Sequence, residues 1–303
     1  MFEAFNFKDV LEASTRGGWK IEDVLPEGAQ LDLDRDLLPQ SLARTDEAPG
    51  LSPEQRKTLN HIRGHEYLTI FGLVEEFILP FVLDHARPQL NSDDERVRAL
   101  LNFASEEAKH IHLFKLFQKR FTDAFGTECD VIGPPEVIAS KVLGHDPLAV
   151  ALLILHIEWM TQRHYVDSVR DDADLCPLFK SLLKHHWIEE AQHAKLDTLM
   201  VKALADGRDD AGLLKAINEY LELGMFLDNG FKAQTEMNIA ALETATGIRL
   251  PADTRSQLID QQHQALRWTY IGSGMTHPKF VATLGAMSPV ARARIADVAP
   301  AFC

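Results

Sequence analysis

Apolar side chains recur at the three- and four-residue spacing of amphipathic helices along most of this chain. No stretch alternates apolar and polar residues between hairpin turns, as strands do. Helix-capping signals divide the pattern; Ser52, Pro53 and Gln55 form one such signal, and Asp146 with Pro147 forms another. The sequence therefore predicts long helices over residues 53–86, 92–126, 147–170, 177–205, 211–246 and 251–271, with shorter helices after residue 135 and at the C-terminal end.

This succession of helices predicts an all-α fold in which four long antiparallel helices are joined by short loops and flanked by additional helices. Residues 1–50 have no sustained period and read as an irregular N-terminal wrapping segment with one short helix. Residues 51–250 would form the helical bundle. Residues 251–303 would add C-terminal helices that pack on the same domain.

Composition narrows the classes of function. The 303 residues contain 31 Lys and Arg against 45 Asp and Glu, a net charge of −14, which disfavours binding to nucleic acid or to an anionic membrane. The longest wholly apolar run, residues 148–155, is too short to span a bilayer. The N-terminus lacks the pattern of a secretory signal. Together with three widely spaced cysteines, these features lead us to expect a cytoplasmic protein.

The cysteine positions also exclude two kinds of metal site. Cys129, Cys176 and Cys303 lie far apart, and the chain has no Cys-x-x-Cys motif. A zinc ribbon or a rubredoxin-type iron site is therefore excluded.

The motif Glu-x-x-His occurs twice, as Glu107 with His110 and as Glu190 with His193. Each copy lies in the middle of a predicted long helix. Three residues correspond to about 300° of rotation, so both side chains share one helix face. A carboxylate and an imidazole on one face can bind a transition metal. A single copy is a weak signal, since surface pairs of this kind are common.

The spacing between the two copies strengthens the metal interpretation. The copies are 83 residues apart, and the same offset relates Glu158 on the third bundle helix to Glu75 on the first. The neighbouring Glu76 is a weaker candidate, because Glu75 alone interrupts an otherwise apolar row. A glutamate in an apolar row needs a partner, since an unpaired buried charge is costly.

Four carboxylates and two histidines from four antiparallel helices are the ligand set of di-iron and di-manganese ferritin-like bundles. The sequence thus predicts a ferritin-like four-helix bundle that holds two metal ions, with Glu107 and Glu190 as bridging ligands. The alternative, charges scattered over solvated helix faces, does not account for the matched offsets.

His186 breaks the symmetry between the two halves. It lies four residues before Glu190 and seven before His193, on the same helix face, whereas its counterpart in the first half is Phe103. We expect His186 to be a seventh ligand, which adds an imidazole to the metal bound by Glu190 and His193. The alternative is a core histidine that supports the ligands. His185 points about 100° away and is not expected to bind metal.

These residues resemble the ligand pattern of the p-aminobenzoate N-oxygenase family. The members of this family are ferritin-like di-iron arylamine oxygenases, distinguished by an extra histidine ligand. The resemblance covers roughly residues 50–250. Each family ligand has a counterpart here: Glu75, Glu107, His110, Glu158, His186, Glu190 and His193.

The resemblance implies that two iron ions, or manganese in their place, use O2 and an external reductant to oxygenate the nitrogen of a small-molecule amine. It further implies an electron donor or reductase and a homodimer as partners. Alternatives are a di-iron hydroxylase that acts on C–H bonds, a rubrerythrin- or ferritin-like redox or metal-handling protein, and a helical scaffold without catalytic activity. Elemental analysis separates the scaffold from the others.

Overall fold

The computed structural model describes residues 4–303, and in this part of the chain the regular structure is helical. The only strand-like pairing there is an isolated bridge between Asp36 and Leu175. The all-α prediction is confirmed. The longer helices are α1 (Phe7–Gly17), α4 (Pro53–Ala86), α5 (Asp94–Phe125), α6 (Pro135–Leu143), α7 (Pro147–His164), α8 (Pro177–Ala205), α9 (Asp210–Thr246), α10 (Ala252–Arg267), α12 (Pro278–Met287) and α13 (Pro289–Val298).

Short helical pieces complete the succession. They are α2 (Ile21–Val24), α3 (Gln40–Ala43), η1 (Arg87–Gln89), η2 (Tyr165–Val169), η3 (Trp268–Gly272), α11 (Ser273–Met275) and η4 (Ala299–Phe302). The π-helical segments η2 and η3 extend α7 and α10, where the sequence predicted that the α-helices themselves would continue.

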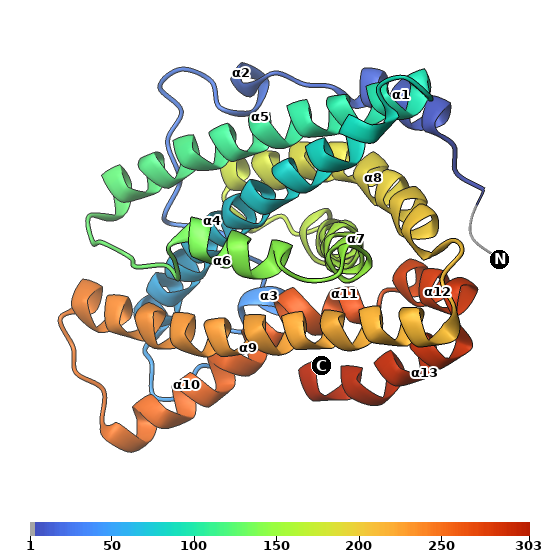
Figure 1. Ribbon diagram of the computed structural model, residues 1–303. Coiled ribbons are helices and arrows are strands. Elements are labelled where there is room, and N and C mark those ends of the chain that lie inside the picture. The colour runs from blue at the N-terminus through green and yellow to red at the C-terminus, as the bar shows by residue number, and fades with distance from the viewer. Residues whose placement is uncertain (1–3) are drawn as a thin grey trace.

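Helices α4, α5, α7 and α8 form the four-helix bundle. α4 packs along α5, α7 packs along α8, and α5 contacts α8. Figure 1 shows α7 end-on near the centre of the molecule, with α4 and α5 on one side of it and α9 crossing on the other. Because α9 packs against both α4 and α7, it closes a side of the bundle that would otherwise be open.

Helix α7 is buried on all sides. Every residue from Leu148 to Thr161 is buried, so the helix has no solvated face. A helix that is apolar all round belongs in a core, and α8, α9, α11 and α12 all contact this one. The sequence of α7 therefore carries Glu158 into the interior of the protein.

The N-terminal segment packs closely on the bundle and contains three helices rather than the single short one expected. The Asn60 side chain of α4 accepts hydrogen bonds from the backbone N–H groups of Leu37 and Leu38, at 2.9 and 3.1 Å. A Cβ atom at Gly64 would lie only 2.6 Å from the Cβ of Leu37. Glycine at this position lets the segment approach α4 closely, because any side chain would displace Leu37.

A fully buried ion pair joins α4 to α9 and η3. Arg63 Nε lies 2.8 Å from Glu66 Oε2. Glu66 also accepts hydrogen bonds from Asn238 at 2.7 Å and from the hydroxyl of Tyr270 at 2.8 Å. These bonds fix the position of the Tyr270 ring. As for membranes, none of the helices within residues 4–303 is both long and apolar enough to cross one.

Candidate metal centre

All seven candidate ligands lie together in the interior of the bundle. α4 contributes Glu75, α5 contributes Glu107 and His110, α7 contributes Glu158, and α8 contributes His186, Glu190 and His193. Every one of these side chains is buried. They form two groups whose ligand atoms lie within 4.8 Å of one another: Glu75, His110, His186 and Glu190 in the first group, and Glu107, Glu158, Glu190 and His193 in the second.

In the first group, two histidine rings converge on the carboxylates of Glu75 and Glu190. His186 Nε2 lies 3.0 Å from Glu75 Oε1 and 2.8 Å from Glu190 Oε1. His110 Nδ1 lies 3.0 Å from the same Glu190 oxygen and 3.6 Å from Glu75 Oε1. Four ligand atoms thus surround one small volume.

The second group is centred on His193. Its Nδ1 atom lies 3.0 Å from Glu190 Oε2 and 3.0 Å from Glu107 Oε1. Glu190 therefore directs one carboxylate oxygen to each group, which is the arrangement needed to bridge two metal ions.

The predicted place of His186 is wrong. It lies with Glu75 and His110 rather than with His193, so the pair of imidazoles belongs to the first group. The reason is the helical rise: seven residues advance about 10 Å along α8, which puts His186 and His193 at opposite ends of the cluster with Glu190 between them. Bridging by Glu107 stays a prediction, since Glu107 belongs to the second group alone.

Burial and mutual repulsion perturb the protonation of the cluster. Burial raises the pKa of Glu107 to about 8, and the charges of Glu75 and Glu190 add to this rise. Burial and Glu190 likewise raise the pKa of Glu158 well above its usual value. Burial opposes the charge on Glu190 too, but the charges of His193 and His186 outweigh it and hold the pKa of Glu190 well below the usual range.

The pKa values of the three histidines are raised, although burial by itself would lower them. Burial would lower the pKa of His186, but the charge of Glu190 and hydrogen bonds to Glu190 and Glu75 raise it to about 9. The pKa values of His110 and His193 are also raised well above the usual value, because bonds to glutamates overcome burial. Without a metal ion, the cluster therefore holds protons between its carboxylates and imidazoles.

The unpartnered atoms fit a pair of cations. Buried polar atoms in folded proteins nearly always have a hydrogen-bond partner, yet three carboxylate oxygens here have none: Glu75 Oε2, Glu107 Oε2 and Glu158 Oε2. Glu107 Oε1, Glu190 Oε1 and His110 Nδ1 lie 3.0 Å from another ligand atom, but the angles are unsuitable for a hydrogen bond. Four carboxylates would also neutralise two divalent cations, whereas one cation would leave buried negative charge, which is costly. Carboxylate and imidazole ligands suit iron and manganese.

Two further glutamates orient the histidines. His193 Nε2 lies 2.8 Å from Glu106 Oε2, and His110 Nε2 lies 2.7 Å from Glu189 Oε2. Each glutamate thus accepts a hydrogen bond from the histidine of the other helix, which leaves Nδ1 free to face the cluster. Partners of this kind fix the tautomer and the ring orientation of metal-binding histidines.

Sequence reasoning missed Glu106 and Glu189, although the signal was present. They are also 83 residues apart, and each directly precedes the glutamate of a Glu-x-x-His motif. The repeated unit is therefore Glu-Glu-x-x-His.

The N-terminal segment supports these two glutamates from outside the bundle. Ser14 of α1 donates a hydrogen bond to Glu106 at 2.5 Å. Lys109 forms an ion pair with Glu189, and its Nζ atom lies 3.8 Å from the centre of the Trp19 ring. The Trp19 indole stacks on His110 with 5.7 Å between ring centres and 14° between planes. Residues preceding the bundle therefore support His110 directly, through Trp19, and His193 indirectly, through Glu106.

The remaining histidines near the bundle centre make other contacts. His156 bonds to the Tyr220 hydroxyl at 2.7 Å, and His164 bonds to the Tyr67 hydroxyl at 2.8 Å. His185 bonds to the backbone carbonyl of Ser181 at 2.7 Å. None of the three belongs to either group of candidate ligands in residues 4–303.

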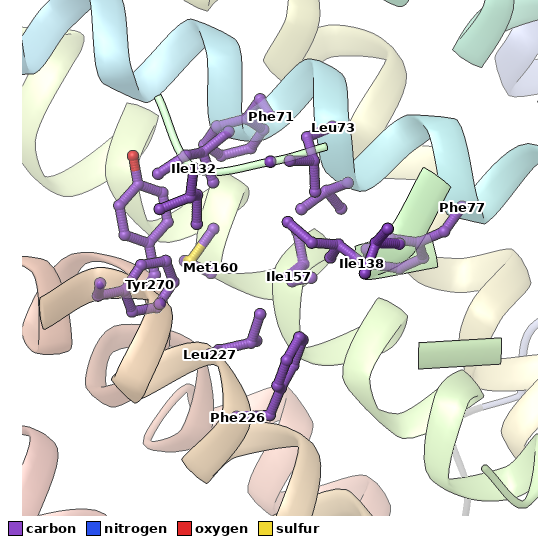
Figure 2. Close-up of a pocket in the computed structure, with 16 residues that line it drawn as sticks. Phe71, Leu73, Phe77, Ile132, Ile138, Ile157, Met160, Phe226, Leu227 and Tyr270 are labelled. Atoms are coloured by element: carbon purple, nitrogen blue, oxygen red, sulfur yellow. The ribbon is translucent and has the colours of Figure 1, made fainter. Parts of the chain in front are cut away.

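An apolar cavity of about 280 Å³ lies beside the cluster, between α4, α6, α7, α9 and η3 (Figure 2). Val74 and Ile157, which line it, directly precede the candidate ligands Glu75 and Glu158. Phe71, also in its wall, meets the His186 ring edge-on at 5.5 Å between ring centres. The sequence could not reveal this cavity, because its lining comes from five separate elements.

The pKa shifts predict how the stability of the metal-free protein depends on pH. The pKa of Glu107 rises from 4.5 to about 8 on folding, so its contribution to stability is full below pH 4.5 and is lost as the pH rises through 8. His186, raised from 6.5 to about 9, acts in the same sense. The lowered pKa of Glu190 adds stability that is lost only at more acid pH. Burial lowers the pKa values of His65 and His156 to about 4, so these groups add stability as the pH rises to about 6.5 and oppose the fall in that range. Denaturant unfolding in the presence of a chelator should therefore show falling stability from pH 7 to pH 8.

The matched variant Glu107→Gln removes one of these titrating groups. Its unfolding free energy should change less steeply with pH over the same interval. A metal-free protein that becomes more stable between pH 7 and pH 8 would contradict the buried, mutually repelling cluster.

A second prediction concerns the orientation of His110. Glu189→Gln removes the charge that holds the His110 ring and pairs with Lys109. We expect metal affinity to fall by about 10- to 100-fold, as is typical when such a partner is lost. Competition with a chelator of known affinity measures the change. Glu222→Gln, on an exposed position of α9, is the control and should bind metal as the original protein does.

Comparisons with known proteins give similarity only to solved structures. No family model matches the sequence, and no curated protein matches it. One similar structure is a variant of an R2-like ligand-binding oxidase with an aerobically reconstituted Fe/Fe cofactor, which is 16% identical with a TM-score of 0.49 over 85% of this chain and 90% of that one. Another variant of such an oxidase, with an aerobically reconstituted Mn/Fe cofactor, is 16% identical with a TM-score of 0.47 over 86% and 92% of the two chains. At these values the likeness decides nothing about the chemistry of the present site, which rests on its own geometry.

Proposed function

We propose that this protein is an O2-dependent oxidoreductase that uses two metal ions, iron or manganese, to oxygenate a small organic molecule. The observation that carries the proposal is the shared glutamate: Glu190 directs one oxygen to each of two buried ligand groups. A structural ion pair would not need two such groups, and it would not leave so many buried ligand atoms unpartnered.

The position of the cavity supports an enzyme rather than a metal store. Residues adjacent in sequence to Glu75 and Glu158 form its wall. An apolar space beside a metal pair lets an organic molecule approach the site and displace water from it. A protein that only stores metal ions has no need of it.

Each part of the site has a definable task. When bound, the metal pair supplies the electrons that activate O2. Glu75, His110 and His186 would hold one ion, Glu107, Glu158 and His193 would hold the other, and Glu190 would contact both. Glu106 and Glu189 keep the Nε2 atoms of His193 and His110 protonated. In a monooxygenation, one oxygen atom enters the substrate and the other leaves as water, with two electrons from an external reductant and two protons.

A second part of the proposal concerns which substrate atom, nitrogen or carbon, receives the oxygen. The extra histidine, His186, is the feature by which the ligand set resembles arylamine N-oxygenases, and it favours transfer of oxygen to an amine nitrogen. Hydroxylation of a C–H bond is the second candidate. It is favoured by the cavity, since none of the lining residues among those the structure describes is charged.

Metal analysis tests the proposal directly. The purified protein, reconstituted with Fe(II) under nitrogen, should contain about two iron ions per chain. Glu190→Ala should lose most of this metal, because both ligand groups lose a member, whereas the exposed control Glu222→Ala should retain it. Elemental analysis with O2-consumption measurements checks both. A single bound ion, or no O2 consumption by protein holding two iron ions and a reductant, would contradict the proposal.

A separate test addresses His186. His186→Ala leaves Glu75, His110 and Glu190 in the first group, so we expect close to two metal ions still to bind. The rate of O2 consumption with an amine substrate should fall by at least about tenfold, since loss of an imidazole changes the electron donation to one ion. Lys184→Ala, at an exposed position of the same helix, is the control, because the His185 ring meets Trp19, which stacks on His110. Unaltered O2 chemistry in His186→Ala would remove the main support for amine oxygenation.

A further inference from the structure

The cavity beside the metal centre has an unusually uniform lining. Sixteen residues surround it, and apart from two glycines and Tyr270 all carry aliphatic, aromatic or thioether side chains. Figure 2 shows the side chains of Leu73, Ile157 and Leu227 turned towards the same space from three different helices. Among residues 4–303, none that lines the cavity offers a charge to a ligand.

The one polar side chain in the wall is already engaged. The Tyr270 hydroxyl donates a hydrogen bond to Glu66 at 2.8 Å, and Glu66 is held in turn by Arg63 and Asn238. Arg63, the buried cation of this network, does not line the cavity; it lies against Glu66 and donates a hydrogen bond to Gln262 at 2.8 Å. Within residues 4–303, the lining therefore offers a ligand no cation and no free hydroxyl.

A lysine in the neighbouring groove is also unable to neutralise a charged ligand in the cavity. Lys115 lines a more open and more polar hollow on the far side of Leu73, where it pairs with Glu76 at 2.9 Å. Leu73, Ile132 and Gly133 form the wall common to both spaces. An ionised group on the part of a ligand that faces this lining would stay unpaired, and burying such a group is unfavourable.

The volume limits the size of the occupant. A cavity of about 280 Å³ is roughly twice the size of the ~150 Å³ apolar cavity that accommodates one benzene molecule. One fused pair of aromatic rings, or a compact hydrocarbon of about ten carbons, fits this space.

We propose that the substrate is a neutral, apolar molecule of this size, and that molecules bearing a carboxylate are excluded. That the bound molecule is oxygenated rests on the proposed function. That the cavity binds such a molecule does not. It narrows the expectation drawn from the family resemblance, because an aminobenzoate-type acid would bury its carboxylate against hydrocarbon. A neutral arylamine without an acid group remains compatible.

A matched pair of ligands tests the inference. 1-Aminonaphthalene is neutral at pH 7.5, and 4-amino-1-naphthoate adds only a carboxylate. Both are titrated into the metal-loaded protein under nitrogen, so that no turnover occurs, and heat and fluorescence are recorded. We expect one equivalent of 1-aminonaphthalene to bind, naphthalene to compete with it, and the naphthoate to bind at least 100-fold more weakly.

Two substitutions on one helix place the binding site. Leu227→Trp puts a larger side chain at a half-buried position of the cavity wall and should weaken 1-aminonaphthalene binding at least tenfold. Met225→Trp, on the exposed face of α9 and outside the lining, should bind as the original protein does. Metal content and melting temperature, measured on each variant, show whether the fold and the metal centre are intact.

The outcomes separate this inference from the proposed function. Equal binding of the acid and the amine, absence of binding by the neutral ligands, or unchanged binding in a folded Leu227→Trp variant would overturn the inference, even if two metal ions and O2 consumption are found. Conversely, selective binding of the neutral ligands to a protein that fails to take up two metal ions would support the inference and refute the proposed oxygenation.

Discussion

The structure is organised around the need to neutralise charge in its interior. Four carboxylates and three imidazoles lie buried between α4, α5, α7 and α8, where an unpaired charge is costly. The raised pKa values of Glu107 and Glu158 and the lowered pKa of Glu190 express the same conflict. A pair of divalent cations would resolve it, so metal binding and the stability of the bundle should be linked.

The parts outside the bundle serve this centre in two distinct ways. The N-terminal segment supports both groups of ligands: Trp19 stacks on the His110 ring, and Ser14 holds Glu106, which bonds to His193. On the other side, α9 and η3 enclose an apolar cavity and keep its one hydroxyl turned to Glu66. Polar support thus surrounds the ligands, while hydrocarbon surrounds the space in which an organic molecule would bind.

Much of the fold and of the ligand set was accessible from the sequence, because helical periodicity and fixed offsets are local properties. The cap at Ser52 and the proline-initiated start of α8 at Pro177 lie where predicted. The 83-residue repeat brought Glu75 and Glu158 into consideration without any structure. The same repeat contained Glu106 and Glu189, which were overlooked because the motif was read as Glu-x-x-His rather than Glu-Glu-x-x-His.

The sequence by itself determined which residues share a helix face, since that depends only on rotation per residue. Only the tertiary structure decided how those faces meet. It assigned His186 to the group of Glu75 and His110, because the rise along α8 separates His186 from His193. It also brought residues of five separate elements together around one cavity, an arrangement that depends on packing between segments far apart in the chain and leaves no periodic trace in the sequence.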